Sequence, residues 1–595
     1  MSVDERLRVP IGSAAATWST RPDCRRVLVI AHTVTSVTRL LDLLPIFDSD
    51  PRIQVVATRA RTSNFREGVT EFLTDLGFAV APWEQAVEER FDLAVSASLG
   101  DDMHLLRAPL IVVSHGAGYN KLMKPETGNR KPETGNRKPE TGNRKPETGN
   151  RKPETGNRKP ETGNRSAVFG LSTETLVRDG RLVPSVLVLS HPEQLDRLGA
   201  SCPEAVPSAL VAGDPTYDRI LAGRRWRAEY RRALDVGERR MVLVSSTWGP
   251  SSLLGRRPEL LSALVGELPA DEYRVVFAAH PNAWHGHGPW QLRNWLASSE
   301  RAGLRVLPPR VGWQAALVAA DHVIGDHGSV TFYGAALGTH TMLGTFPHDE
   351  LDPASPIAEF GRTARLLAGD RPLRDQLVAD ADRHRPDRFA GVTRLLTSLP
   401  EKSARVLRTA CYRLMDLPEP GHAVRVTPPE PPRPFQRQWP DVGVSVPMTV
   451  TADGDAAEVR VERRPAELVR DGRVVLDRPH IVAGADEPDT HWLESADIVV
   501  EARDTGEPWR RVADTLAAHP GARFAAVRSG PDCLVGARGG RRFRLRPETD
   551  PSGIAPEVFA SAFWRVYTAL RGKVAAGTVK VHVGERHVVL RVVPE

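Results

Sequence analysis

The chain has 595 residues, of which 41% are hydrophobic and 6% aromatic, so it is long enough for several folded domains with ordinary cores. Its formal net charge is +6. The heptapeptide KPETGNR occurs six times in succession from Lys124 to Arg165, and each copy carries a net charge of +1. The repeats account for the whole excess charge, so we expect no nucleic-acid partner for the folded domains.

Cysteines and apolar runs exclude further classes of protein. Cys24, Cys202, Cys411 and Cys533 lie far apart without a Cys-x-x-Cys pair, so we expect neither a zinc site nor a disulfide framework. The first residues, MSVDERLRVP, lack the pattern of a secretory signal, and no run approaches the roughly 18 apolar residues of a membrane helix. We expect a cytoplasmic protein, with peripheral attachment to the inner membrane face as an alternative.

The first 120 residues alternate between apolar strands and amphipathic helices, which is typical of a parallel α/β sheet. The predicted strands are RRVLVIAHT, IQVVATR, FDLAVSA and APLIVVSH, and SVLVLSH follows the repeats. We therefore predict an N-terminal Rossmann-like half over 1–200, interrupted at 124–165. The repeat has no apolar residue that could pack in a core, and Pro and Gly recur in every copy, so we predict that it is disordered.

A second set of strands and helices follows. The strands are ALVAGDP, MVLVSSTWG, RVVFAAHP, LRVLPP, HVIGDHGS and HTMLGTFP. They predict a second Rossmann-like half over 201–415, and the helices at its end are expected to pack back across both halves. Nine prolines between Pro418 and Pro447 predict a semi-rigid linker at 416–447.

Residues 448–595 predict a separate α+β domain of unknown role. His480, Asp486, Asp489 and His491 gather in RPHIVAGADEPDTHW, where a metal site and a polar loop are both open interpretations. The segment PEVFASAFWRVYTAL predicts an amphipathic helix. Its apolar positions, which suit either a membrane or partner surface or the domain's own core, are Phe559, Phe563, Val566 and Leu570.

Polar residues follow several of the predicted strands, at the edge where open α/β sheets bind ligands. LIVVS ends in His115-Gly116, MVLV in Ser245-Ser246-Thr247, and RVVFAA in His280. HVIG ends in Asp326-His327-Gly328-Ser329, which opens a helix whose free N–H groups favour an anion. Each of these residues could instead be a helix cap. Together they predict a cleft that binds phosphate, lined by Gly116, Ser246 and Thr247, with no metal ligand.

The order HGAGYNK, GDPTYDR, SSTWG, AAHP and GDHGSVTFYGAALG resembles the CDP-glycerol glycerophosphotransferase family, bacterial GT-B-type enzymes that build teichoic acids. The resemblance implies a GT-B-like pair of domains, with His115 as the general base. It also implies that the donor phosphates are held by His280, Asp326, Gly328 and Ser329. The donor, a CDP-alditol or a nucleotide sugar, is a substrate, and no cofactor is expected.

On this interpretation the enzyme moves a glycerophosphate, polyol-phosphate or glycosyl group to a hydroxyl acceptor, either free or membrane-associated, in the synthesis of a cell-envelope polymer or glycoconjugate. The chain departs from the family at Ala117-Gly118, where Thr-Pro is usual, and at Gly328, where Ser is common. These departures favour an alternative, a non-catalytic GT-B-like scaffold that binds nucleotides or partners through the repeat and the C-terminal domain. The repeat itself is either a neutral expansion in a tolerant loop or a basic tether for an anionic partner.

Overall fold

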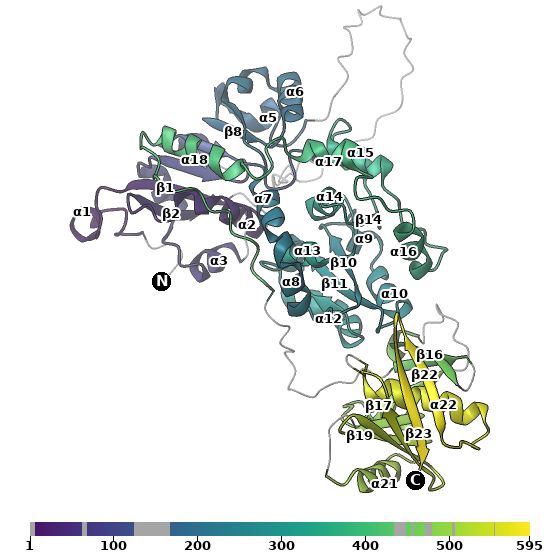
Figure 1. The fold of residues 1–595 in the computed structure, drawn as a ribbon. Helices are drawn as coiled ribbons and strands as arrows, with labels where there is room; N and C mark the ends of the chain where they lie inside the picture. Colours follow the sequence, from purple (N-terminus) through teal and green to yellow (C-terminus); the bar gives the residue numbers. More distant parts are fainter. Residues whose placement is uncertain are drawn as a thin grey trace, which may run out of the picture.

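The computed structural model describes residues 6–61, 68–100, 102–123, 167–432, 448–454, 457–469, 479–501, 506–551 and 554–595. The prediction of disorder for the repeat at 124–165 lies outside these residues, and so does the linker at 433–447. The described residues form three domains along the chain (Figure 1).

The first domain is built on a parallel sheet with strand order β3-β2-β1-β4-β5-β8-β9. Its strands are β1 (Arg25–Ala31), β2 (Ile53–Arg59), β3 (Val80–Ala81), β4 (Leu93–Ser96), β5 (Leu110–Val112), β8 (Val186–Leu189) and β9 (Ala209–Val211). Its helices are α1 (Ala15–Trp18), α2 (Val34–Leu43), α3 (Val69–Asp75), α4 (Trp83–Glu88), α5 (Thr173–Leu176) and α6 (Pro192–Ser201). The central strands are buried on both faces, which explains their continuous apolar sequences.

The first domain also recruits segments that follow it in sequence. Strand β9 completes the first sheet by pairing with β8, although the sequence analysis assigned ALVAGDP to the second half. Such a short apolar run does not reveal which sheet it joins. Helix α18 (Ser403–Leu414) returns from the far end of the second domain and lies on the first sheet (Figure 1). Leu407 and Cys411 of α18 join the core formed by Val27 and Val29.

The second domain has a parallel sheet with strand order β12-β11-β10-β13-β14. The strands are β10 (Arg240–Ser246), β11 (Tyr273–Ala279), β12 (Arg305–Val306), β13 (His322–Gly325) and β14 (His340–Leu343). The helices are α7 (Pro215–Gly223), α8 (Arg227–Ala233), α9 (Leu253–Arg256), α10 (Leu260–Glu267), α11 (Pro281–His287), α12 (Pro289–Arg301), α13 (Trp313–Ala319), α14 (Ser329–Ala336), α15 (Pro356–Thr363), α16 (Leu373–Ala381) and α17 (Ala390–Thr393). Two α/β halves with parallel sheets are therefore confirmed.

The C-terminal domain is a sheet that closes on itself, in the order β15-β16-β22-β23-β21-β20-β19-β18-β17. Its strands are β15 (Met448–Asp453), β16 (Glu458–Pro465), β17 (His480–Gly484), β18 (Ile498–Glu501), β19 (Phe524–Ser529), β20 (Asp532–Ala537), β21 (Arg542–Pro547), β22 (Gly577–Val583) and β23 (Arg586–Pro594). Its helices are α19 (Ala466–Val469), α20 (Thr490–Ser495), α21 (Pro508–Ala518) and α22 (Pro556–Ala569). The domain combines strands and helices as the α+β prediction requires.

The apolar face of α22 lies in the core of its own domain. Phe559, Phe563 and Val566 are buried there, and only Leu570, just beyond the helix, is 40% exposed. The interpretation of this face as a membrane or partner surface is therefore wrong, because the curved sheet already covers it. No helix among the described residues is long and apolar enough to cross a membrane.

The histidines and aspartates of RPHIVAGADEPDTHW have separate roles. His480 is buried and stacks on Trp564 of α22, with ring centroids 4.2 Å apart. Asp489 caps α20 by accepting a hydrogen bond from the backbone N–H of His491 at 3.0 Å. Within the described ranges, no three His, Cys, Asp or Glu side chains are placed to hold a metal ion.

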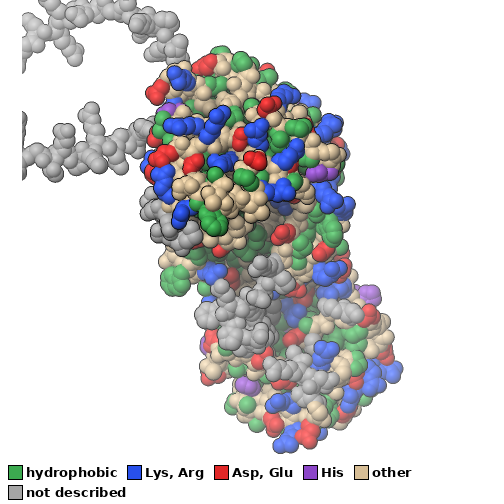
Figure 2. Space-filling model, turned by 90° about the vertical axis from the view of Figure 1, so that its left-hand side faces the viewer, with side chains coloured by type: hydrophobic (Ala, Val, Ile, Leu, Met, Phe, Trp, Pro, Cys, Tyr) green, Lys and Arg blue, Asp and Glu red, His purple; other side chains and the backbone are tan. Residues whose placement is uncertain are grey.

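The C-terminal domain packs against the second domain (Figure 1). Arg463 of β16 donates two hydrogen bonds to Asp271, at 2.7 and 2.8 Å, and its backbone oxygen accepts from the N–H of Ala270 at 2.9 Å. The described part of the linker also lies on the second domain, since Tyr230 donates to the carbonyl of Pro429 at 2.6 Å. On the face shown in Figure 2, basic and acidic side chains are interspersed, so no single-sign patch stands out there.

Candidate active site

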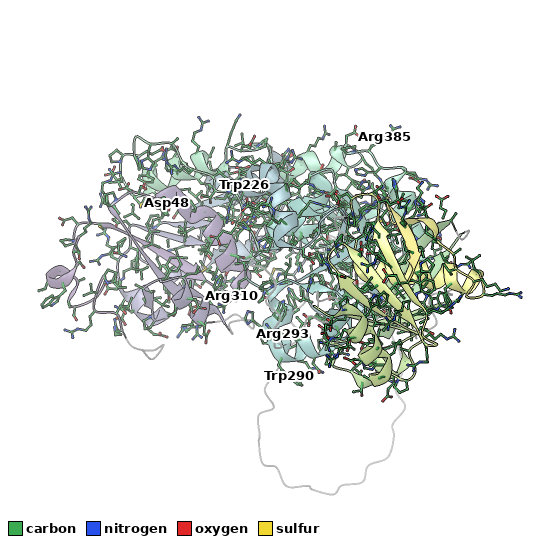
Figure 3. The ribbon with its side chains drawn as sticks, turned by 60° about the horizontal axis from the view of Figure 1, so that its bottom comes forward. Asp48, Trp226, Trp290, Arg293, Arg310 and Arg385 are labelled. Carbon is green, nitrogen blue, oxygen red and sulfur yellow. The ribbon has the colours of Figure 1, made fainter. Side chains whose placement is uncertain are left out.

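The carboxyl ends of the strands in the first two domains meet at one place, which we call the domain junction. Two contacts define it. The Oγ1 of Thr35, at the start of α2, lies 3.4 Å from Nε2 of His280, which caps α11. The backbone N–H of Ala117, after β5, donates to Oγ of Ser329 at 2.9 Å. Elsewhere between the two domains Arg310, which is labelled in Figure 3, pairs with Asp75 at 2.8 Å. The strand-end residues from both halves are thus brought together.

His115 lies in the turn that follows β5 and is exposed to solvent. Phe169 packs edge-on against the ring, with centroids 6.1 Å apart. The surrounding protein atoms, and after them the positive charges of Lys121 and Arg39, lower the pKa of His115 to about 4. The imidazole is therefore neutral at pH 7, which is the form that accepts a proton.

His280 faces the junction from the second domain. Its Nδ1 accepts a hydrogen bond from the N–H of Asn282 at 3.0 Å, so the ring proton is assigned to Nε2, which points toward Thr35. Burial, followed by the charges of Lys121 and His115, lowers the pKa of His280 to about 3. His280 is thus both a helix cap and a neutral N–H donor at the junction.

Asp326 organises the turn that opens α14. Its carboxylate, 1% exposed, accepts from the N–H and the hydroxyl of Thr247, both at 2.8 Å, and from the N–H groups of Leu253 and Gly328 at 2.9 and 3.0 Å. Both oxygens are engaged within the protein, so Asp326 orients the turn instead of pointing at a ligand. A side chain at Gly328 would place Cβ 2.8 Å from Cγ2 of Thr247, which explains the glycine.

Two of the predicted lining residues are buried beneath the junction. Ser246 accepts from the N–H of Leu254 at 2.9 Å and donates to the carbonyl of Thr247 at 3.0 Å. Thr247 is held by Asp326 as described above. Both residues therefore support the turn from below. Gly116 does lie at the junction, where a Cβ would stand 2.6 Å from Oγ of Ser329.

The start of α14 offers an environment for an anion. The first N–H groups of an α-helix have no partner within the helix, and the helix dipole adds positive potential there. Helix α14 begins at Ser329 without a side-chain cap, directly opposite the turn that carries His115. A phosphate at this position would lie near Lys121, whose charge depresses the pKa of both junction histidines.

Several residues that shape the junction were missed by the sequence analysis. Lys121 places its ammonium group 5.7 Å from the ring centre of Trp248 in the second domain. His32 lowers the pKa of His115, and Arg39 contacts the His115 turn. Lys121 stands in the quoted HGAGYNK motif, which offered a signal, whereas nothing in the local sequence marks Arg39.

The insertion begins and ends beside His115. The N–H of Met123 donates to the carbonyl of Ala167 at 2.8 Å, and the N–H of Phe169 donates to the carbonyl of Lys121 at 2.9 Å. These bonds form a short antiparallel stem that closes the segment 124–166. On its other side the stem meets the second domain, where Leu122 donates to the carbonyl of Glu350 at 3.0 Å.

No protein-family model matches the chain, and no curated protein sequence matches it either. Among solved structures it is similar to a variant of the wall teichoic acid polymerase TagF soaked with CDPG, at 12% identity over 67% of this chain and 91% of that one, with a TM-score of 0.43. Anabaena HepE in complex with UDP-glucose is similar at 9% identity over 66% and 99% of the two chains, with a TM-score of 0.35. A UDP-GlcNAc 2-epimerase from Methanocaldococcus jannaschii is similar at 12% identity over 65% and 99%, with a TM-score of 0.36.

Proposed function

We propose that the chain is a GT-B-like transferase that moves a glycerophosphate, polyol-phosphate or glycosyl group from a nucleotide-diphosphate donor to a hydroxyl acceptor. One observation carries the proposal. The turn that carries His115 contacts the start of the uncapped helix α14, the charge of His115 acts on His280 of the second domain, and both imidazoles are neutral at pH 7. A neutral imidazole suits proton abstraction, and helix amides suit a pyrophosphate.

In this mechanism His115 takes the proton of the acceptor hydroxyl as its oxygen attacks. For a CDP-alditol the attack is on the β-phosphorus, the bond to the bridging oxygen breaks, and CMP leaves. For a nucleotide sugar the attack is on the anomeric carbon and the nucleoside diphosphate leaves. His280, through Nε2–H, and the first amides of α14 would stabilise the negative charge that grows on the leaving group.

The donor phosphates also raise the low pKa of His115 and so make it a stronger base. A pKa of about 4 makes the free imidazole a poor base. A bound phosphate places negative charge beside the ring and raises this pKa toward neutrality. Proton abstraction is then efficient only when the donor is bound.

Donor binding and turnover test the proposal separately. The first measurement is the melting temperature with CDP-glycerol, UDP-GlcNAc and the free nucleotides, since a ligand at about 100 times its Kd stabilises by about 2.7 kcal/mol. His280→Ala should abolish the shift. His287→Ala, which removes an exposed histidine that contacts Trp295 on the neighbouring helix, is the matched control and should keep it.

Turnover is then followed with the donor that binds. His115→Ala should lower kcat by about 10²- to 10⁴-fold, which is the usual contribution of a general base to the rate, while donor Kd changes little. A His115→Ala protein that keeps its full biological activity would favour the non-catalytic scaffold. Absence of a shift with every donor would contradict nucleotide binding at the junction altogether.

A further inference from the structure

A buried arginine holds the backbone on both sides of His115. Arg39 lies on α2, with its side chain 6% exposed. Its Nε donates to the carbonyl of Ser114 and its Nη2 to the carbonyl of Gly116, both at 3.1 Å. These two carbonyls flank His115, so the position of the guanidinium sets the path of the turn that carries the imidazole.

The same guanidinium reaches the second domain. Nη1 donates to the hydroxyl of Tyr333 on α14 at 3.1 Å, and Nη2 pairs with Oδ1 of Asp214 at 2.9 Å. Tyr333 donates in turn to Oδ2 of Asp214 at 2.8 Å. Asp214 is fully buried and lies between β9 and α7, where the chain crosses from the first sheet to the second domain. One closed network therefore joins α2, the crossover and α14.

Helix α14 is linked to the His115 turn in two ways, once directly and once through Arg39. Ser329 and Tyr333 are four residues apart, so they share one face of the helix. Ser329 accepts directly from the N–H of Ala117 at 2.9 Å, and Tyr333 acts through Arg39. The turn is thus held between the start of α14 and the guanidinium, and neither contact survives if α14 moves away.

We propose that Arg39 is a positioning residue that, with Asp214 and Tyr333, locks the His115 turn to α14 and so presents the imidazole only when the second domain is docked. This inference rests on the proposed role of His115 as the base. Its consequence is that the geometry of the base depends on the contact between α14 and the His115 turn. Hydrogen bonds to a buried charge are costly to leave unmade, so the network favours two discrete arrangements, joined or separated.

Tyr333→Phe tests the lock with little change of shape. The variant loses only the hydroxyl that accepts from Arg39 and donates to Asp214, so it cuts the link from α14 to the guanidinium. The ring keeps its stacking on Tyr217, whose centroid lies 5.9 Å away. Tyr217→Phe is the matched control, because it removes the hydroxyl that donates to the carbonyl of Ala336 at 3.0 Å, in the same cluster but away from the His115 turn.

The readout is hydrogen–deuterium exchange of the Ala117 amide in the full chain without ligand, since this N–H donates across the junction. Tyr333→Phe should speed its exchange by about tenfold or more, and Tyr217→Phe should leave it within about twofold of the wild-type rate. Arg39→Lys, which keeps the charge toward Asp214 but cannot reach all its present acceptors, should have the same effect and replaces Tyr333→Phe if that variant does not fold. Wild-type exchange in the folded variants would overturn the lock.

Kinetics separates the lock from the proposed function. With the donor identified by the melting screen, Tyr333→Phe should lower kcat by about tenfold and leave donor Kd within about twofold, because the donor site is intact and the base is misplaced. Faster exchange with unchanged kcat would overturn the role of the lock in turnover. A wild-type protein that binds no donor would instead contradict the proposed function, and the exchange result would stand independently of it.

Discussion

Binding of a donor at the domain junction should take up protons. The pKa values of His115 and His280 are about 4 and about 3 without ligand, so both rings are almost wholly neutral at pH 6. A phosphate charge about 4 Å from a ring contributes about 4 kcal/mol at an effective dielectric constant of about 20, which raises a histidine pKa by about 3. The pKa of His115 in the complex is then about 7, so binding takes up about 0.9 proton at pH 6, whereas Nδ1 of His280 already accepts from the N–H of Asn282 and has no free lone pair for a second proton.

Titration calorimetry in two pH 6 buffers of different ionisation enthalpy measures this uptake. CDP-glycerol or UDP-glucose is the suitable ligand, because a diphosphate diester does not itself titrate near pH 6. The complex holds more protons than the free protein, so donor Kd should tighten as pH falls from 8 to 6. His115→Ala, which should keep donor binding, should remove nearly all of this uptake at the same pH, and His287→Ala should not change it. A heat independent of buffer, with a flat Kd over this range, would refute the reasoning.

Three further predictions concern stability. Asp326→Asn should lower the free energy of unfolding by about 3 kcal/mol, since the amide cannot accept every hydrogen bond that the carboxylate accepts. A melting temperature equal to that of the wild type in calorimetry would contradict this. Burial lowers the pKa of His480 to about 3, so the unfolded chain takes up a proton below about pH 6.5 while the folded chain does not. The free energy of unfolding should therefore fall by about 2 kcal/mol between pH 7 and pH 5, and urea unfolding curves of His480→Phe should lack this fall. Arg463→Ala removes the side chain that donates to Asp271 and should speed exchange of the Ala270 amide at least tenfold. An unchanged rate would contradict the role of this pair in docking the two domains.

The two α/β halves could be predicted because strands buried on both faces read as continuous apolar runs. The same logic placed His115, His280 and Ser329 at strand ends that meet in the structure. The role of Asp326 could not be read in this way, because a carboxylate after a strand looks the same whether it faces a ligand or backbone amides. The role of Arg39 could not be predicted for a different reason. Its partners lie far apart along the chain and come together only when the two domains pack.

The place of the insertion explains how a long repeat can begin next to a candidate active site. Residues 121–123 and 167–169 pair with each other, so the two ends of the segment are already held together before any repeat residue is added. Enlarging a loop whose ends are fixed costs only about 0.6 kcal/mol per doubling of its length. The stem is itself anchored to Glu350 in the second domain, and Arg39 holds the His115 turn from the opposite side. The geometry of the imidazole therefore depends on the stem and the guanidinium, and the number of repeat copies can change without moving it.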